Sequence, residues 1–140
     1  MSEIALPKIE KSIKDKKKEI VKKLSKLTNS DNVLSEADEL RPYETDALSV
    51  YTQTPLAVVL PENTEQVSEI LKYCHEENIK VVPRGAGTGL SGGALPLQDA
   101  ILLGLGKFNQ ILEIDYHNKC VVTQPGVTNL GITHAVQHKG

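Results

Sequence analysis

The stretch "PRGAGTGLSGG", residues 83–93, constrains this chain more than any other, because it places five glycines among eleven residues directly after the apolar run at 79–82. Glycine has no Cβ atom, so it adopts positive φ easily and lets a ligand approach the main chain closely. Successive backbone N–H groups in such a loop form a concave anion-binding site when they turn inward. A flexible linker would be polar throughout, whereas this loop includes apolar side chains that need a packing surface. The stretch therefore predicts a shaped loop that binds an anion such as a diphosphate.

The same loop satisfies two nucleotide-binding patterns only in part. Residues 87–92 match GxGxxG, but a dinucleotide fold needs a helix directly after this motif and an acidic residue about 20 residues later. Pro96 interrupts any helix there, and Phe108 stands near the place of the acid. A P-loop needs a lysine, and none lies between Arg84 and Lys107. We therefore exclude a standard Rossmann site and a P-loop.

A third pattern, GxSxG, fits residues 89–93 and makes Ser91 a candidate nucleophile, with Asp115 and His134 following in the order of an α/β-hydrolase triad. A nucleophile elbow places its serine immediately after a strand, yet Ser91 lies nine residues past Val82. A serine hydrolase is therefore a minor alternative. A non-catalytic nucleotide-binding or interaction module is the other alternative.

The flanking sequence predicts a β-α-β unit. An apolar strand at 57–60 ends at Pro61, and Asn63 with Gln66 predicts a capping box at the start of a helix, with Thr64 as a competing cap. The second strand covers 79–82. Between them, the apolar stripe of the helix has the spacing i, i+3, i+4, i+7 and consists of Val67, Ile70, Leu71 and Cys74.

Further strands and one more helix follow. The segments "AILLGL", "QILEI" and "CVVTQ" have strand composition, and Thr128 caps a final helix whose apolar residues are Leu130, Ile132, Ala135 and Val136. The segment 41–55 has prolines near both ends and no helical period, which predicts irregular chain. We expect an α+β fold with a basic helical arm and linker at 1–40 and the main domain at 41–140.

The arm is locally basic, with nine lysines between Lys8 and Lys26. Its apolar residues line one side of a helix, at Ile9, Ile13, Ile20, Leu24 and Leu27. We expect this amphipathic N-terminal helix to dock on its own domain with its lysines in solvent, and we leave a membrane or partner contact as the alternative.

Composition narrows the class of protein further. A formal net charge of −2, four tyrosines and one phenylalanine disfavour nucleic-acid binding. Cys74 and Cys120 lack metal-ligand or disulfide-framework spacing, so we expect no metal site and a reducing compartment. No apolar run approaches the ~20 residues of a membrane span. We therefore expect a cytoplasmic protein without a membrane span.

Three stretches together resemble a known family. The stretch "VVPRGAGTGLSGGALP", preceded by "YETDALSVYTQTP" and followed by "VVTQPGVTNLGI", is similar to the PCMH-type FAD-binding domain of vanillyl-alcohol oxidase type, in the glycolate oxidase and D-lactate dehydrogenase branch. The likeness covers roughly residues 40–140. It implies the N-terminal half of such a domain, with the β-α-β unit and the later strands as its parts.

The resemblance implies FAD as the cofactor and two sets of contact residues. The expected diphosphate contacts are Pro83, Arg84, Gly85, Ala86, Gly87, Thr88, Gly89, Ser91 and Gly92. A second stretch is expected to lie against the cofactor and consists of Gln124, Pro125, Gly126 and Val127. Gly87 stands where covalent relatives often carry the histidine that bonds the flavin, so the resemblance implies non-covalent FAD.

The reaction implied by the resemblance is oxidation of a 2-hydroxy acid, of the glycolate or D-lactate type, to a 2-oxo acid. The implied partners are FAD and this substrate, with an electron-transfer partner left open. Relatives continue well beyond the matching part, where their substrate arginine and metal ligands lie. We therefore assign no catalytic residue and expect the 140-residue chain to be an N-terminal fragment that is inactive by itself.

Overall fold

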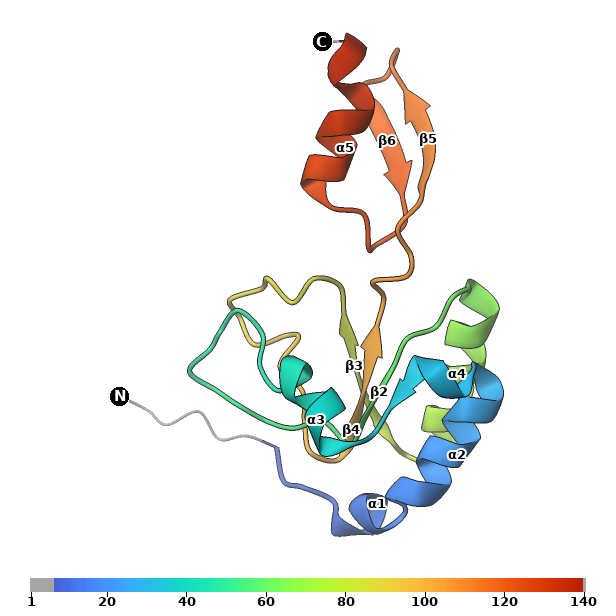
Figure 1. Ribbon diagram of the computed structural model, residues 1–140, viewed down its shortest axis with the longest axis vertical. Coiled ribbons are helices and arrows are strands. Elements are labelled where there is room, and N and C mark those ends of the chain that lie inside the picture. The colour runs from blue at the N-terminus through green and yellow to red at the C-terminus, as the bar shows by residue number, and fades with distance from the viewer. Residues whose placement is uncertain (1–6, 140) are drawn as a thin grey trace.

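The computed structural model describes residues 7–139, which fold around a four-stranded sheet with the strand order β1-β2-β4-β3 (Figure 1). These strands are β1 (Val33–Leu34), β2 (Ala57–Val59), β4 (Ala100–Gly104) and β3 (Lys80–Arg84). The helices of this part are α1 (Lys11–Asp15), α2 (Lys17–Leu27), α3 (Ala37–Leu40) and α4 (Thr64–Glu76). Short 3-10 turns cover Ser30–Asn32 and Arg41–Tyr43. The α+β class is confirmed.

The predicted β-α-β unit is present as β2-α4-β3, but its two strands are not neighbours. β4 lies between them and pairs in parallel with both, with Val58 opposite Leu102 and Val82 opposite Leu102 from the other side. All five residues of β4 are buried, as expected for the central strand of a parallel sheet. β1, which no sequence pattern predicted, adds an antiparallel edge to β2. Because β2, β3 and β4 run in one direction, their carboxyl ends share one edge of the sheet.

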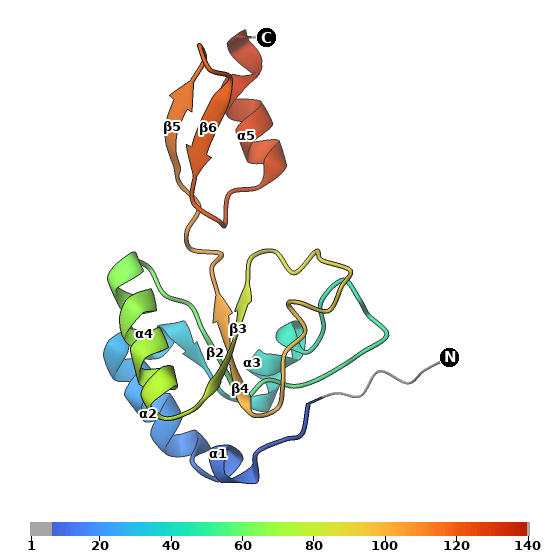
Figure 2. The same cartoon turned by 180° about the vertical axis from the view of Figure 1, so that it is seen from behind.

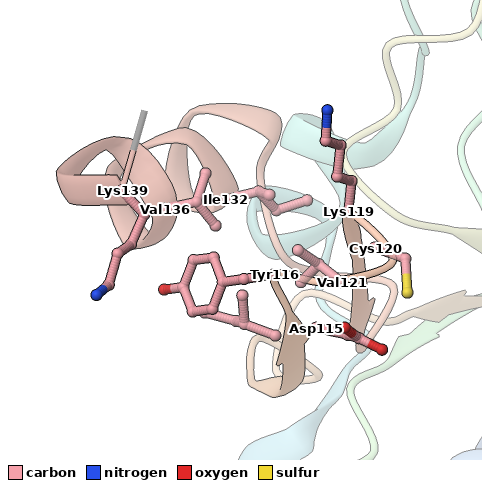
Figure 3. A pocket seen from close by; sticks show the side chains of 9 residues that line it. Asp115, Tyr116, Lys119, Cys120, Val121, Ile132, Val136 and Lys139 are labelled. Atoms are coloured by element: carbon pink, nitrogen blue, oxygen red, sulfur yellow. The ribbon is translucent and has the colours of Figure 1, made fainter.

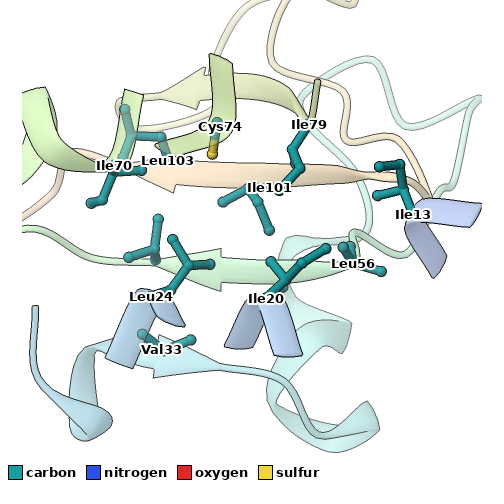
Figure 4. Packing of buried hydrophobic residues seen from close by; sticks show 12 residues of the cluster. Ile13, Ile20, Leu24, Val33, Leu56, Ile70, Cys74, Ile79, Ile101 and Leu103 are labelled. Carbon is teal, nitrogen blue, oxygen red and sulfur yellow. The ribbon is translucent and has the colours of Figure 1, made fainter. Parts of the chain in front are cut away.

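The basic arm docks on the domain and belongs to its core, as expected. It forms two helices separated at Lys16 instead of one continuous helix. Ile20 and Leu24 of α2 are buried against sheet residues such as Ile101, and Ile70 and Cys74 of α4 complete the same cluster (Figure 4). Most lysines of the arm are exposed to solvent. The long-range contacts of residues 13–24 therefore stabilise the same core as the sheet.

A buried ion pair anchors the start of the arm. The Asp99 carboxylate is 2% exposed and accepts hydrogen bonds from Lys80 Nζ at 2.7 Å and from the Glu10 N–H at 2.8 Å. Burial raises the pKa of Asp99, but these hydrogen bonds outweigh it, so the net pKa lies below its usual value. Lys80 also donates to the Lys8 carbonyl. The arm is thus joined to the amino-terminal ends of β3 and β4 by charge, and it is joined to the core by apolar packing.

Three apolar residues predicted to be buried are exposed. Ile9 precedes α1, Leu71 lies on the outer side of α4 and Leu130 lies on the last helix, with exposures of 44%, 45% and 62%. Leu71 fitted the helical stripe, but the sheet and α2 contact only the side of α4 that carries Ile70 and Cys74. Tyr73 packs against the core cluster as a partly buried residue instead. The apolar face predicted from helical spacing is therefore broader than the face that packs against the core.

The predicted helix caps are confirmed with one difference. The Asn63 side chain accepts a hydrogen bond from the Gln66 N–H at 2.8 Å, so Asn63 and not Thr64 is the cap of α4. The Gln66 side chain bonds the Glu62 N–H at 2.7 Å instead of the Asn63 N–H of a standard capping box. Thr128 caps the last helix by accepting from the Gly131 N–H at 3.0 Å.

A second lobe, residues 111–139, stands beyond the carboxyl edge of the sheet (Figures 1 and 2). It consists of an antiparallel hairpin of β5 (Ile111–Asp115) and β6 (Cys120–Thr123), followed by α5 (Asn129–Val136) and a 3-10 turn at Gln137–Lys139. The Gly126 N–H donates to the Phe108 carbonyl at 2.7 Å. A Cβ atom on Gly126 would lie 2.7 Å from the carbonyl oxygens of Leu105 and Phe108. Only glycine allows this close junction between the lobe and the sheet.

Replacement of Leu24 by alanine should strongly destabilise the protein, because Leu24 is fully buried between α2, the sheet and α4. We expect a loss of about 2–5 kcal/mol in the free energy of unfolding for a buried leucine. Leu71→Ala, the same substitution at a half-exposed position, should cost far less. Urea titration of both variants measures the difference, and equal losses would contradict the arm's place in the core.

Replacement of Gly126 by alanine should displace the 124–127 turn, because the new methyl group would meet two carbonyl oxygens. We expect a loss of roughly 1–3 kcal/mol in the free energy of unfolding, as for other overpacked sites. Gly106→Ala is the matched control, since nothing lies within 4 Å of its Cβ position. Denaturant titration of the two variants checks this, and a Gly126→Ala protein as stable as Gly106→Ala would show that the junction is not tight.

Candidate functional site

The glycine loop, residues 85–93, begins where β3 ends at the carboxyl edge of the sheet (Figure 1). Gly87 and Gly92 have φ angles of +70° and +74°, a backbone conformation that residues other than glycine rarely adopt. No helix follows the loop before β4, and Pro96 is buried. The loop therefore lacks the helix N-terminus that a Rossmann dinucleotide site requires.

The backbone N–H groups of the glycine loop make no hydrogen bonds to the part of the chain that the structure describes. Within residues 7–139, none of the N–H groups from Gly85 to Gly93 donates a hydrogen bond. A Cβ atom on Gly89 or Gly93 would meet nothing within 4 Å, so these positions border open space. Thr88 and Ser91 are exposed beside them and carry hydroxyl donors. A run of unpartnered amides next to hydroxyl groups is well suited to the oxygens of a diphosphate.

The fold brings the second predicted stretch next to the glycine loop. Residues 124–127 form a turn in which the Val127 N–H donates to the Gln124 carbonyl at 3.2 Å. A Cβ atom on Gly85 would lie 3.6 Å from the Pro125 carbonyl oxygen, so the two stretches are in van der Waals proximity. Two stretches far apart in the sequence thus meet at the junction between the sheet and the second lobe.

The Gln124 side chain already has a partner in the protein. Its amide oxygen accepts from the Gln110 N–H at 2.9 Å, and the Gln124 N–H donates to the Gln110 carbonyl at 2.9 Å. These bonds join the residue before β5 to the residue after β6. The Gln124 side chain therefore holds the turn through its amide oxygen.

Arg84 points back into the protein and braces the loop. Its guanidinium donates to the Ala94 carbonyl through Nε at 3.2 Å and Nη2 at 2.6 Å, and the residue is 7% exposed. Burial lowers the pKa of Arg84, and the negative charge of Asp46 acts in the opposite direction. The side chain therefore links the start of the glycine loop to its end and supplies positive charge from behind it.

Two contacts to the glycine loop come from a segment whose sequence predicted only irregular chain. The Ala47 N–H donates to the Gly87 carbonyl at 2.8 Å, and Leu48 Cδ2 would lie 3.6 Å from a Cβ atom on Gly92. This segment was part of the family resemblance, which was the one available signal. No local pattern predicts which backbone groups a loop contacts.

The hydrolase alternative has no geometric support. Ser91 is exposed, and no hydrogen bond joins it to Asp115 or His134 within the described part of the chain. The Asp115 carboxylate instead accepts from the N–H and the side-chain amide of Asn118 at 2.9 and 2.7 Å, which lowers the pKa of Asp115. Ser91 and His134 are both exposed, and Asp115 is bonded within its own turn.

A groove with a volume of about 630 Å³ lies away from the glycine loop. It is formed by the hairpin and α5, with Tyr116, Val121, Ile132 and Val136 on its walls (Figure 3). No group of three potential metal ligands occurs anywhere in residues 7–139. Among the same residues, no helix has the length and apolar character needed to cross a bilayer.

Comparison with known proteins agrees with this geometry. The chain is 51% identical over 104 residues to glycolate oxidase subunit GlcD of Escherichia coli, a match that covers 74% of this chain and 21% of that protein. It is 36% identical to the mitochondrial D-2-hydroxyglutarate dehydrogenase of Arabidopsis thaliana, covering 68% of this chain and 17% of that protein.

Among solved structures, p-cresol methylhydroxylase with substrate bound superposes with a TM-score of 0.75 at 32% identity, covering 86% of this chain and 24% of the other. The chain thus spans about a sixth to a quarter of the length of these relatives. Residues 55–140, which include the glycine loop and the 124–127 turn, match the family described as FAD binding domain. This chain therefore belongs to the FAD binding domain family, with FAD as its cofactor.

Proposed function

We propose that this chain holds the diphosphate of FAD in a flavin-dependent oxidoreductase that converts a 2-hydroxy acid to a 2-oxo acid. The observation that carries the proposal is the run of N–H groups from Gly85 to Gly93, which have no hydrogen-bond partner among residues 7–139 and are bordered at Gly85 by the 124–127 turn. A diphosphate needs several backbone donors and room to approach the main chain, and the space at the Cβ positions of Gly89 and Gly93 supports such an approach. The cofactor therefore fits the residues present.

The proposed contacts divide by what each residue does. The amides of 85–89 and 91–92 donate to diphosphate oxygens, and Thr88 and Ser91 add hydroxyl donors, each hydrogen bond to a charged oxygen contributing roughly 1.5–3 kcal/mol. Pro83 and Arg84 shape the start of the loop, and Arg84 adds positive charge. Residues 124–127 form the opposite wall beside Gly85.

The substrate class rests on the names of the relatives, which include glycolate oxidase, D-2-hydroxyglutarate dehydrogenase and a putative D-lactate dehydrogenase. Acceptance of a hydride from the carbon that bears the hydroxyl group is the chemistry that a flavin supplies when bound. This chain's own residues bind and orient the cofactor, and we assign no catalytic base among them. We propose that turnover needs a substrate site formed by sequence other than these 140 residues. We also propose that it needs an electron-transfer partner.

We also propose that the protein works in a reducing, cytoplasmic setting. Cys74 and Cys120 are both free, and Cys74 is buried in the core, where burial raises the pKa of its thiol to about 11. A thiol with such a pKa is almost entirely protonated at neutral pH and is a poor nucleophile. Cys74 therefore serves packing and not chemistry.

Replacement of Gly87 by valine should abolish FAD binding, because a β-branched residue at a φ of +70° forces the loop into another conformation. We expect at least about a hundredfold weaker binding, since each tenfold corresponds to about 1.4 kcal/mol. Its Cβ position is 3.5 Å from the Arg84 side chain, an ordinary contact, so the fold should persist. Flavin fluorescence titration and thermal melting separate the two effects.

Two variants serve as controls for the Gly87 experiment. Gly106→Val makes the same change in open space outside the loop and should leave binding intact. Ser91→Ala should lose only the contribution of one hydroxyl group. Normal FAD binding by Gly87→Val would refute the assignment of the glycine loop to the diphosphate.

The flavin should be held without a covalent bond, because the glycine loop contains no histidine, cysteine or tyrosine that could form one. Acid denaturation of FAD-loaded protein should therefore release all flavin into the supernatant. Absorbance of the supernatant and the washed precipitate near the flavin bands measures the distribution. Colour that stays in the precipitate would contradict the prediction.

A further inference from the structure

A second loop, residues 44–53, lies beside the glycine loop in both views of the molecule (Figures 1 and 2). Its ends are joined by a hydrogen bond from the Gln53 N–H to the Glu44 carbonyl at 2.8 Å. Its contacts reach the two glycines with positive φ: the Ala47 N–H bonds the Gly87 carbonyl, and Leu48 lies against Gly92. The 44–53 loop therefore supports the glycine loop at its two most constrained positions.

Asp46 fixes the backbone conformation of the residues that contact the glycine loop. One carboxylate oxygen, Oδ1, accepts from the Leu48 N–H at 2.9 Å and so fixes the backbone that carries Ala47 and Leu48. The residue is 7% exposed, and within residues 7–139 its other oxygen, Oδ2, is buried without a hydrogen-bond partner. A buried carboxylate with an unpaired oxygen is unfavourable unless a positive charge lies nearby. A nearby positive charge would therefore stabilise the buried Asp46 carboxylate.

Arg84 supplies that charge. It is equally buried, it feels the Asp46 carboxylate electrostatically, and its guanidinium is held on the Ala94 carbonyl just beyond the glycine loop. Attraction to the Asp46 carboxylate partly offsets the cost of burying the Arg84 charge, although no salt bridge within residues 7–139 joins the two side chains.

We propose that Asp46 is a positioning residue for the glycine loop: it holds the Leu48 N–H and so orients Ala47 and Leu48 against Gly87 and Gly92, and its charge attracts the Arg84 guanidinium, which is bonded to the far end of the loop. The loop amides then stay in the arrangement that receives a diphosphate. Asp46 does not contact the ligand, because its Oδ2 atom is covered and a carboxylate would repel phosphate oxygens. The inference rests on the proposed function, since the ligand is the same FAD diphosphate.

Asp46→Asn tests the charge while preserving an acceptor for the Leu48 N–H, and Asp46→Ala removes both. We expect about tenfold weaker FAD binding for the first and about a hundredfold for the second, the range for losing hydrogen bonds to charged groups. Asp38→Asn, which neutralises an exposed carboxylate on α3, is the matched control and should bind normally. Fluorescence titration with FAD gives these values.

A second readout needs no ligand. In ¹H–¹⁵N spectra of the free chain, Asp46→Asn should shift the amide signals of Gly87 and Gly92, while signals of the buried strand β4 remain in place. Arg84→Gln should shift the same loop signals. In the Arg84→Gln background, Asp46→Asn should weaken FAD binding by less than about twofold, because the charge it removes no longer has its partner.

The outcomes separate this inference from the proposed function. If Gly87→Val abolishes FAD binding but Asp46→Asn alters neither affinity nor the loop signals, the positioning role is wrong and the proposed function stands. If Gly87→Val binds FAD normally, the proposed function fails, and the spectra still decide whether Asp46 holds the loop. Should Asp46→Asn not fold, unchanged Gly87 and Gly92 signals in Arg84→Gln would overturn the inference.

Discussion

The parallel pairing of β4 between β2 and β3 is the constraint on which the rest of this structure depends. It places the carboxyl ends of three strands at one edge, so that the glycine loop after β3 and the segment after β4 leave the sheet side by side. The Leu105 N–H continues this pairing by donating to the Arg84 carbonyl at 2.8 Å. Further along the chain, Gly126 packs closely on the carbonyl groups of Leu105 and Phe108. This packing places the neighbouring Pro125 beside Gly85 of the glycine loop. The candidate site is therefore assembled by strand pairing and not by any single motif.

Charged groups join segments that the apolar core leaves unconnected. Asp99 and Lys80 hold the start of the arm, and Lys107 bonds the Asn32 side chain at 2.6 Å and Glu62 at 2.9 Å. Arg84 spans the glycine loop from behind. Such contacts, of which the Lys107–Glu62 pair is exposed, add modest net stability but join particular segments of the chain. Arg84 and Lys107 lie at the carboxyl edge, at which FAD is proposed to bind, and the Asp99–Lys80 pair lies at the opposite edge of the sheet.

Much of the candidate site could be predicted because its signal is local. Five glycines, a strand before them and a proline where a helix would begin suffice to predict an anion-binding loop, and the two positive φ angles at Gly87 and Gly92 agree with that prediction. The roles of Arg84 and Gln124 differ from simple contacts, since their side chains are bonded to Ala94 and Gln110. Apart from the family resemblance, no signal in the sequence predicted the contacts of the 44–53 loop, because they use backbone groups and a buried carboxylate that carry no periodic pattern.

The sequence by itself determined the positions of β2 to β6, the caps at Asn63 and Thr128 and most of the apolar side of the arm, because these depend on interactions within a few residues. Only the tertiary structure decided that β4 enters between β2 and β3, that Leu71 and Leu130 face solvent, and that Gly85 meets Pro125. Helical spacing specifies a face of a helix but not how much of it a neighbour will cover. Strand composition likewise specifies a strand but not its partner, which depends on the packing of residues far apart in the chain.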